Sequence, residues 1–163
     1  MLSTARIPVN SLEGEWRAAR MEEQPRPVIL DPLRRAHLPQ LLNLVSSGHA
    51  KSPWIFCRDD NTEPDDRYIP LKTGDGRFSW GDILSTLSTR GIKSIMIEGG
   101  ANVISDVLSR KMADVIIITI APVFIGRDGV GIAASLQEEE WLYDEQSISI
   151  GKDIVFAGRI RKD

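Results

Sequence analysis

The sequence is poor in cysteine and histidine, the residues that build disulfide frameworks and zinc sites. Cys57 is the single cysteine among 163 residues, so no intrachain disulfide can form. The two histidines, His37 and His49, lie in polar segments without cysteine or carboxylate spacing around them. This pattern argues against zinc chemistry and against a serine or cysteine triad. Cys57, inside an apolar segment, is interpreted as a packing residue.

An excess of basic charge and a long apolar run are also missing. Lys and Arg number 20 against 23 Asp and Glu, a formal net charge of -3, so nothing favours nucleic acid as a partner. The longest apolar run, Val115–Ile120 with its flanks, is far shorter than the roughly 20 residues that span a bilayer. The N-terminus has no sustained apolar stretch typical of a secretory signal. We therefore expect a cytoplasmic protein without a membrane partner.

The remaining composition is that of a globular protein with one core. Hydrophobic residues make up 42% and charged residues 26% of the chain. Residues 1–24 have scattered apolar positions without a clear period and are interpreted as an N-terminal arm or loop remnant. Residues 25–163, where the pattern becomes regular, are predicted to form a single α/β domain.

Short apolar segments alternate with helical periodicity along this domain. Strand–helix alternation implies crossover connections and a mainly parallel sheet. Pro70 confines its strand to a sheet edge, whereas the β-branched segment Val115–Ile120 is expected to be buried on both sides. Near the end, Ser147–Ile150 and Ile154–Ala157 predict an antiparallel hairpin. The other predicted strands are Val28–Leu30, Trp54–Cys57, Tyr68–Leu71 and Ser94–Ile97, and the predicted helices centre on residues 38–45, 80–87 and 103–108.

The segment IMIEGGANVI carries the strongest chemical signal. A predicted strand runs into Glu98, followed by Gly99 and Gly100 and then by a helix. Paired glycines let a ligand approach the backbone, and the free N–H groups at the start of a helix attract phosphate. Ligands of open α/β sheets also lie beyond the carboxyl ends of strands. A tight strand-to-helix turn explains the same residues equally well, so both interpretations stay open.

Three further positions are weaker candidates. Glu98 ends an apolar strand, where a carboxylate is costly unless a substrate amine or hydroxyl, a backbone N–H or a lysine binds it. Arg58 follows a predicted strand and is interpreted either as a contact to a cofactor phosphate or as an ordinary surface arginine. The glycine-rich segment Gly126–Gly131 favours a turn, with ligand contact as the alternative.

Four ordered segments together resemble a known family. They are Gln24–Asp31, Ile95–Ala101, Ile118–Gly126 and Gly151–Arg159. Their order is similar to that in the reductases of riboflavin biosynthesis, namely the fungal and archaeal 2,5-diamino-6-ribosylamino-4(3H)-pyrimidinone 5′-phosphate reductase and the C-terminal half of the bacterial bifunctional deaminase-reductase. The resemblance covers about Asn10 to Ile160.

The resemblance implies a dihydrofolate-reductase-like fold and a homodimeric enzyme that uses NADPH. The implied reaction reduces a ribosylamino group to a ribitylamino group: the sugar ring opens to an imine and hydride passes to C1. Such enzymes mainly position two bound molecules. Glu98 matches the acidic residue on the substrate side, and Phe78 matches a cofactor contact. The other implied cofactor contacts are Gly99, Gly100, Ala101, Asn102 and Val103.

One departure from the family concerns the start of the chain. Family members begin with a strand carrying a serine-x-aspartate-glycine-lysine-like motif, a leucine-arginine helix and a glycine/threonine cofactor loop, and none of these occurs here. The first strand is therefore expected to be missing, which would leave Val115–Ile120 with a hydrophobic edge that an arm or a second subunit must cover. Three hypotheses follow: an NADPH-dependent reductase, a non-catalytic remnant serving as a binding or assembly module, and another nucleotide-using enzyme of this fold, such as a pteridine reductase.

Overall fold

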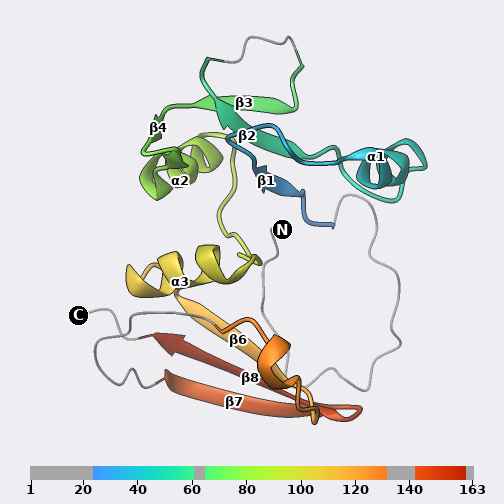
Figure 1. Cartoon of the computed structure of the whole chain (residues 1–163), viewed down its shortest axis with the longest axis vertical. Coiled ribbons are helices and arrows are strands. Elements are labelled where there is room, and N and C mark those ends of the chain that lie inside the picture. Colours follow the sequence, from blue (N-terminus) through green and yellow to red (C-terminus); the bar gives the residue numbers. More distant parts are fainter. Residues whose placement is uncertain (1–23, 61–64, 132–141, 161–163) are drawn as a thin grey trace. The chain divides into compact units, whose positions relative to one another are not determined.

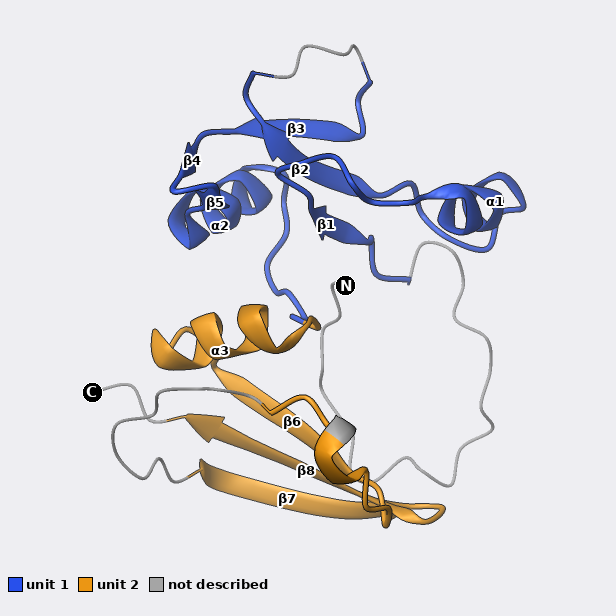
Figure 2. Ribbon diagram, viewed as in Figure 1, with its two compact units in different colours: residues 1–97 blue, residues 98–163 orange. Residues whose placement is uncertain are grey.

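The computed structural model describes residues 24–60, 65–131 and 142–160. The chain divides into two compact units, Met1–Ile97 and Glu98–Asp163, which are described separately (Figure 2). The arm predicted for residues 1–24 lies outside the described residues except for Gln24. The assignment of residues 25–163 to a single domain stays a prediction.

A three-stranded parallel sheet forms the centre of the first unit (Figure 1). In this sheet β2 lies between β1 and β3, and both neighbours run parallel to it. Pro70 lies in β3, an edge strand, as its missing N–H predicts. Because the strands are parallel, their carboxyl ends lie at one edge of the sheet. The bounds are β1 (Val28–Leu30), β2 (Trp54–Arg58) and β3 (Tyr68–Leu71).

Two helices and a short hairpin complete the first unit. Asp75 and Gly76 form the hairpin turn with φ of 50° and 74°, the positive values that a type I′ turn requires. Ser79 directly precedes the second helix, but its side chain makes no capping hydrogen bond. The elements are α1 (Pro39–Ser46), β4 (Thr73–Gly74), β5 (Arg77–Phe78) and α2 (Trp80–Thr89).

The hydrophobic core of this unit is built around β2. Ile55, Phe56 and Cys57 are all fully buried, which confirms Cys57 as a packing residue. Phe56 packs with Ile69 of β3 and with the two residues that α2 buries, Ile83 and Leu87. The apolar face of α2 therefore covers the sheet, and this contact is the main source of stability in the unit.

Ser94–Ile97 does not form the predicted strand. Residues 92–100 follow α2 without helix or strand structure. An apolar sequence favours an extended backbone, but a strand also needs a neighbour that pairs with its N–H and C=O groups. Within the described residues this segment has no such ladder, and Ile95 packs against the core of the first unit instead.

The second unit combines a helix with an antiparallel sheet in which β8 lies between β6 and β7. The predicted hairpin is confirmed and is longer than expected, with Gly151 and Lys152 as its two-residue loop. Gly151 has φ of 62°, the left-handed conformation that favours glycine. Together with the parallel sheet of the first unit, this confirms the α/β class. The elements are α3 (Ala101–Ser109), β6 (Val115–Ile120), the 3-10 turn η1 (Gly126–Asp128), β7 (Leu142–Ile150) and β8 (Asp153–Ile160).

The strand β6 is exposed, contrary to the expectation of burial on both sides. Among the described residues it pairs only with β8, and Ile118 and Ile120 are 45% and 51% exposed. A run of β-branched residues predicts a strand but does not show which layers cover it, so this burial prediction was wrong. The hydrophobic edge expected from the family comparison is present in the described structure.

Candidate functional site

The segment with the two glycines leads into α3. Gly100 occupies the position before the helix, with φ of -65° and ψ of 165°, and its carbonyl accepts hydrogen bonds from the N–H groups of Val103 and Ile104. No side chain caps this end, and the first turn contains no acidic residue. The positive end of the helix dipole is therefore not neutralised by its own residues, an arrangement that suits an anion such as phosphate.

The two glycines differ in whether a side chain would fit at their position. A Cβ atom at Gly99 would lie 3.0 Å from Cβ of Val103 and 3.2 Å from its Cγ1, so close packing against α3 explains that glycine. A Cβ atom at Gly100 would meet nothing within 4 Å, and its φ is accessible to any residue. The tight-turn interpretation therefore accounts for Gly99, whereas Gly100 keeps a space open that the described structure does not fill.

The structure places the predicted site residues in two different units. Phe78 belongs to β5 of the first unit, where its ring centroid lies 6.4 Å from that of Phe56 and its side chain packs on the core. Glu98 is exposed, so the cost of a buried carboxylate does not apply to it. The residues that share one continuous segment of the second unit are Glu98, Gly99, Gly100, Ala101, Asn102 and Val103.

An open pocket of about 220 Å³ lies at the carboxyl edge of the parallel sheet. Sequence reasoning missed it, except that Arg58 was considered as a phosphate contact. The signal was present: Asp-Pro-Leu-Arg-Arg directly follows β1, at the edge where parallel sheets bind ligands. The pocket is lined by Pro32, Leu33, Arg34, Arg58 and Asp60.

A buried carboxylate organises the turn beside this pocket. Asp31 is 9% exposed, and its two carboxylate oxygens accept hydrogen bonds from the backbone N–H groups of Arg35 at 2.9 Å and Ala36 at 2.7 Å. Its own N–H donates to the carbonyl of Phe56 in β2. The side chain thus holds the loop after β1 in one conformation, the usual role of an aspartate in such a turn.

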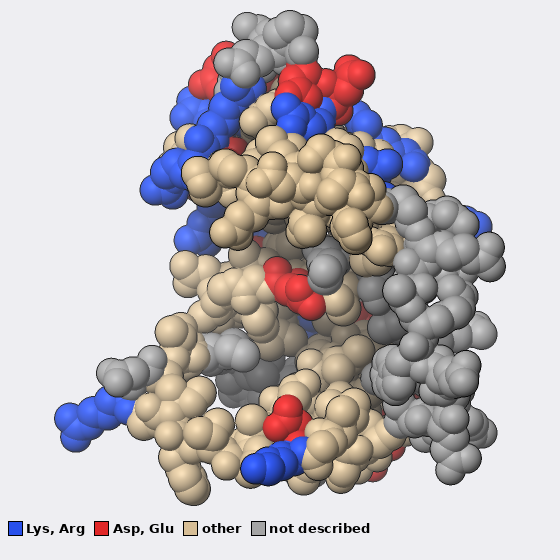
Figure 3. Space-filling view, turned by 90° about the vertical axis from the view of Figure 1, so that its right-hand side faces the viewer, with Lys and Arg blue, Asp and Glu red and all other residues tan. Residues whose placement is uncertain are grey.

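Ion pairs lie at both ends of the parallel strands, Arg58 with Asp60 after β2 and Arg67 with Asp65 before β3. Arg58 Nη2 lies 2.8 Å from Asp60 Oδ2. Hydrogen bonds from the side chain and backbone of Arg67 lower the pKa of Asp65 to about 2. Because Asp65 is held as a carboxylate by its neighbour, it serves the turn before β3 and not as an acid near neutral pH. Figure 3 shows acidic and basic side chains next to one another at the top of the view.

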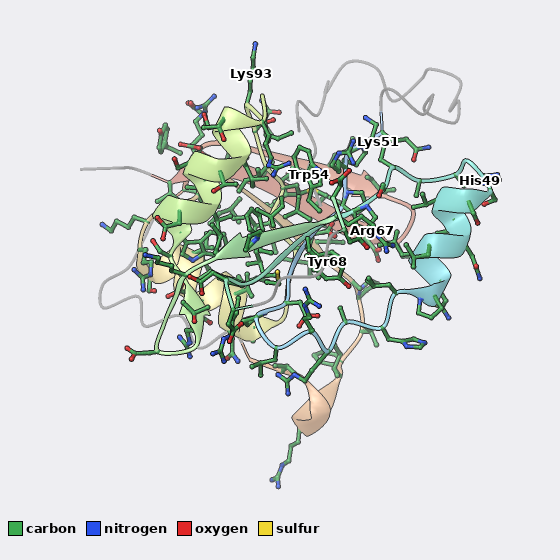
Figure 4. The ribbon with its side chains drawn as sticks, turned by 90° about the horizontal axis from the view of Figure 1, so that it is seen from above. His49, Lys51, Trp54, Arg67, Tyr68 and Lys93 are labelled. Carbon is green, nitrogen blue, oxygen red and sulfur yellow. The ribbon has the colours of Figure 1, made fainter. Side chains whose placement is uncertain are left out.

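The tryptophan of β2 contacts two arginines. The guanidinium carbon of Arg26 lies 4.7 Å from the centroid of the Trp54 ring and that of Arg90 lies 5.1 Å from it. Such cation–π contacts stabilise the sheet by about 0.5–1 kcal/mol each at exposed sites. In Figure 4, Trp54 and Tyr68 are labelled at the neighbouring strands β2 and β3, whereas His49 lies beside α1. No group of three metal-ligating side chains comes together within the described ranges.

The amino-acid sequence of the chain matches the model of a known protein family. A model of the RibD C-terminal domain family matches residues 3–156. The chain belongs to this family.

Curated relatives of this RibD C-terminal domain carry one name. The 2,5-diamino-6-ribosylamino-4(3H)-pyrimidinone 5′-phosphate reductase of Debaryomyces hansenii is 38% identical over 127 residues, covering 68% of this chain and 51% of the relative. The reductase of the same name from Kluyveromyces marxianus is 34% identical over 116 residues, covering 67% of this chain and 47% of the relative. The chain thus spans about half the length of the curated relatives it matches.

Solved structures agree with the family assignment. The riboflavin biosynthesis reductase Rib7 of Saccharomyces cerevisiae is similar with a TM-score of 0.73 and 25% identity, covering 85% of this chain and 71% of that protein. A pyrimidine reductase-like protein of Corynebacterium diphtheriae has a TM-score of 0.63 at 19% identity, covering 85% of this chain and 62% of that protein, and supports the fold. The dihydrofolate-reductase-like fold expected for this RibD C-terminal domain is thereby confirmed.

Two further predictions concern the glycine-rich segment and membrane-spanning helices of this RibD C-terminal domain. Gly126, with φ of 73°, starts the single turn η1, as favoured for the glycine-rich segment. Among the described helices, none combines the length and apolar character needed to cross a bilayer.

Proposed function

We propose that this chain carries out the NADPH-dependent reduction of 2,5-diamino-6-ribosylamino-4(3H)-pyrimidinone 5′-phosphate to its ribitylamino form. The observation that carries the proposal is the family match over residues 3–156 together with the reductase name shared by the curated relatives. The open glycine at the start of α3 supports it independently, because it offers a phosphate-bearing cofactor a place at a helix N-terminus.

The start of α3 fits a nicotinamide cofactor. Gly100 leaves room for close approach of a ligand to the backbone, and the uncapped first turn, with Ala101 and Asn102, presents the positive end of the helix dipole. NADPH, when bound, would supply the hydride that reduces C1 of the opened ribosylamino group. The residues proposed to hold it are Gly99, Gly100, Ala101, Asn102 and Val103 of the second unit, and the contact that the resemblance implies for Phe78 of the first unit stays a prediction.

Glu98 has the substrate-side role in this proposal. It is exposed and lies directly before the glycine pair, so its carboxylate can accept a hydrogen bond from an amine or hydroxyl of the pyrimidine substrate. Its task is to orient the substrate, since the rate of a hydride transfer depends mainly on how two bound molecules are placed. Three backbone or apolar contacts at Gly99, Gly100 and Val103 then set the position of the cofactor.

A titration of the purified chain with NADPH, followed by turnover with the pyrimidine substrate, tests the proposal. We expect saturable binding at micromolar concentration, on the order of -8 kcal/mol, and oxidation of NADPH that depends on the substrate. The cofactor's own fluorescence is the signal, because it reports binding wherever the tryptophans lie.

The alternative is that the chain is a catalytically impaired member of the family that serves as a binding or assembly module. The exposed apolar strand β6 favours this alternative, because such a surface suits association. A folded chain that neither binds NADPH nor turns over the substrate would support it and exclude the reductase. Turnover of a pteridine in place of the pyrimidine would identify a different reductase of the same fold.

A cytoplasmic homodimer is part of the proposal. The free, buried Cys57 is compatible with a reducing compartment. Ile118 and Ile120 of β6 are about half exposed along a sheet edge without charged residues or proline, a surface that native proteins normally cover. We expect sedimentation equilibrium to give twice the chain mass, and Ile118→Lys to lower it to one chain mass. A wild-type monomer at micromolar concentration would contradict the dimer.

A further inference from the structure

We propose that the amino edge of the parallel sheet is a docking surface for an acidic protein segment, with Arg26 and Arg90 as the groups that bind its carboxylates. The central carbons of the two guanidinium groups lie near one ring, 4.7 Å and 5.1 Å from the centroid of Trp54. Arg26 precedes β1, Trp54 begins β2 and Arg90 follows α2, so folding brings three separate segments together. The inference does not rest on the proposed function.

Arg26 is held in position but keeps most of its hydrogen-bonding capacity. Its Nη1 atom donates to the carbonyl of Ser52 at 2.5 Å, which ties the start of β1 to the segment before β2. A guanidinium group has several N–H donors, and within the described ranges no other oxygen accepts a hydrogen bond from this side chain. The remaining donors can therefore bind carboxylate oxygens, whose planar geometry matches that of a guanidinium group.

Arg90 supplies a second guanidinium group, on an exposed residue. Its backbone N–H donates to the carbonyl of Leu87 at the end of α2, and its side chain reaches the ring of Trp54. In the part of the chain that the structure describes, neither Arg26 nor Arg90 forms an ion pair with a carboxylate. Two positive charges thus share one ring without a countercharge, and an anion that contacts both would reduce their repulsion.

The acidic residues before β3, at the same edge of the sheet, do not neutralise the two stacked arginines. Asp65 is bound to Arg67 by hydrogen bonds from its side chain and backbone, so this pair adds no net charge. Asp66 is exposed, and so is Lys93, whose side chain extends away from the ribbon just after α2 (Figure 4). Because these two charges are of opposite sign, the surface keeps the positive charge of the stacked arginines.

The chemistry of this surface favours a protein segment over nucleic acid. Proteins bind single-stranded nucleic acids largely by stacking bases on aromatic rings, but the ring of Trp54 is already engaged by two guanidinium groups. The chain also has a formal net charge of -3, which disfavours a phosphate backbone. The open pocket of this unit lies at the opposite, carboxyl edge of the sheet. A segment with neighbouring aspartate or glutamate side chains is therefore the partner that the amino edge fits.

Fluorescence anisotropy of the full chain with labelled probes tests the inference. The probe is a short oligoglutamate peptide, and oligoglutamine and oligouridine of the same length are the comparisons. We expect oligoglutamate to bind at least about tenfold more tightly than oligoglutamine, and to bind more weakly as the salt concentration rises. Equal binding of the two peptides would overturn the inference. Tighter binding of oligouridine would overturn it as well, because the surface would then recognise nucleic acid.

Three substitutions of arginine separate a specific surface from a general effect of charge. Arg26→Gln and Arg90→Gln are each expected to weaken oligoglutamate binding by about fivefold to tenfold. Arg35→Gln removes the same charge from an exposed residue in the loop after β1, at the carboxyl edge, and is the matched control with less than about a twofold effect. Equal losses in all three variants would refute the docking surface.

A fourth substitution tests whether the ring positions the two arginines. Trp54→Leu keeps both charges but removes the cation–π contacts, so we expect a severalfold loss of oligoglutamate affinity without any change in net charge. Trp54 also packs against the core, so circular dichroism must show that the variant is folded. Unchanged affinity in folded Trp54→Leu would contradict the role of the ring. The Arg90→Gln result stands without this variant, because Arg90 is exposed and its loss should not affect folding.

Discussion

Replacing Gly100 with serine is expected to weaken NADPH binding about tenfold or more while leaving the fold intact. The backbone of Gly100 is in the extended conformation typical of a helix N-cap, and a Cβ atom there meets nothing within 4 Å. Serine is among the preferred N-cap residues because its hydroxyl accepts a hydrogen bond from the first turn. The same hydroxyl would fill the open space and occupy the N–H groups that we assign to the cofactor.

Affinity and stability therefore change in opposite directions in Gly100→Ser. Thermal unfolding should show a stability equal to that of the wild type or higher by a few tenths of a kcal/mol, and the NADPH titration should show the loss. Unchanged NADPH affinity in a folded Gly100→Ser variant would remove the start of α3 from the cofactor site.

Gly99→Ala is the comparison variant. The added Cβ would lie 3.0 Å from Cβ of Val103, closer than ordinary contact, so Val103 in the first turn of α3 must give way by a few tenths of an ångström. A loss of binding in this variant therefore does not distinguish a ligand contact from the adjustment of Val103. The neighbouring glycines thus separate a packing requirement from a binding requirement.

Phe56→Ala is expected to reduce the free energy of unfolding by about 3–5 kcal/mol. Phe56 is fully buried in the central strand β2, where it pairs with Leu30 of β1 and Ile69 of β3. Its ring packs on Ile83 and Leu87 of α2, so its removal leaves a cavity that a strand held on both sides cannot close. Since domains are stable by only about 5–15 kcal/mol, this substitution takes a large part of the margin.

Urea denaturation followed by circular dichroism measures this loss, with Leu44→Ala as the control. Leu44 is 49% exposed on α1, which buries none of its residues, so its truncation should cost less than about 1 kcal/mol. Comparable midpoints for the two variants would show that β2 is not the centre of the stable core.

Local patterns in the sequence predict most of the elements. Apolar runs bounded by proline or polar residues correctly indicate β1, β2 and β3, and spacing of three and four residues correctly indicates the three α-helices. Glycines also help to predict turns, because a backbone with positive φ favours glycine. Gly151, with its positive φ, lies in the loop of the predicted hairpin. These features depend on residues only a few positions apart, which is why one chain suffices to predict them.

Two predictions about strands were wrong, one for Ser94–Ile97 and one for the burial of β6. Both depended on pairing with residues far away in the chain. Ser94–Ile97 and β6 have the same apolar, β-branched character, yet one has no ladder in the described residues and the other is an exposed edge. Composition shows that a segment favours an extended backbone, but the partner that completes a ladder lies elsewhere in the chain or in another chain. No local signal distinguishes these cases.

The sequence by itself determined the class of fold, the family resemblance and the packing role of Cys57, and it predicted a cofactor site at the glycine pair before α3. Only the tertiary structure decided that Gly99 is needed for packing whereas Gly100 is not, that Phe78 belongs to the core, and that Arg34 and Arg58 line one pocket. The physical reason is distance along the chain. Propensity and periodicity act between neighbours, whereas burial, open space and the meeting of two charges depend on residues that only folding brings together.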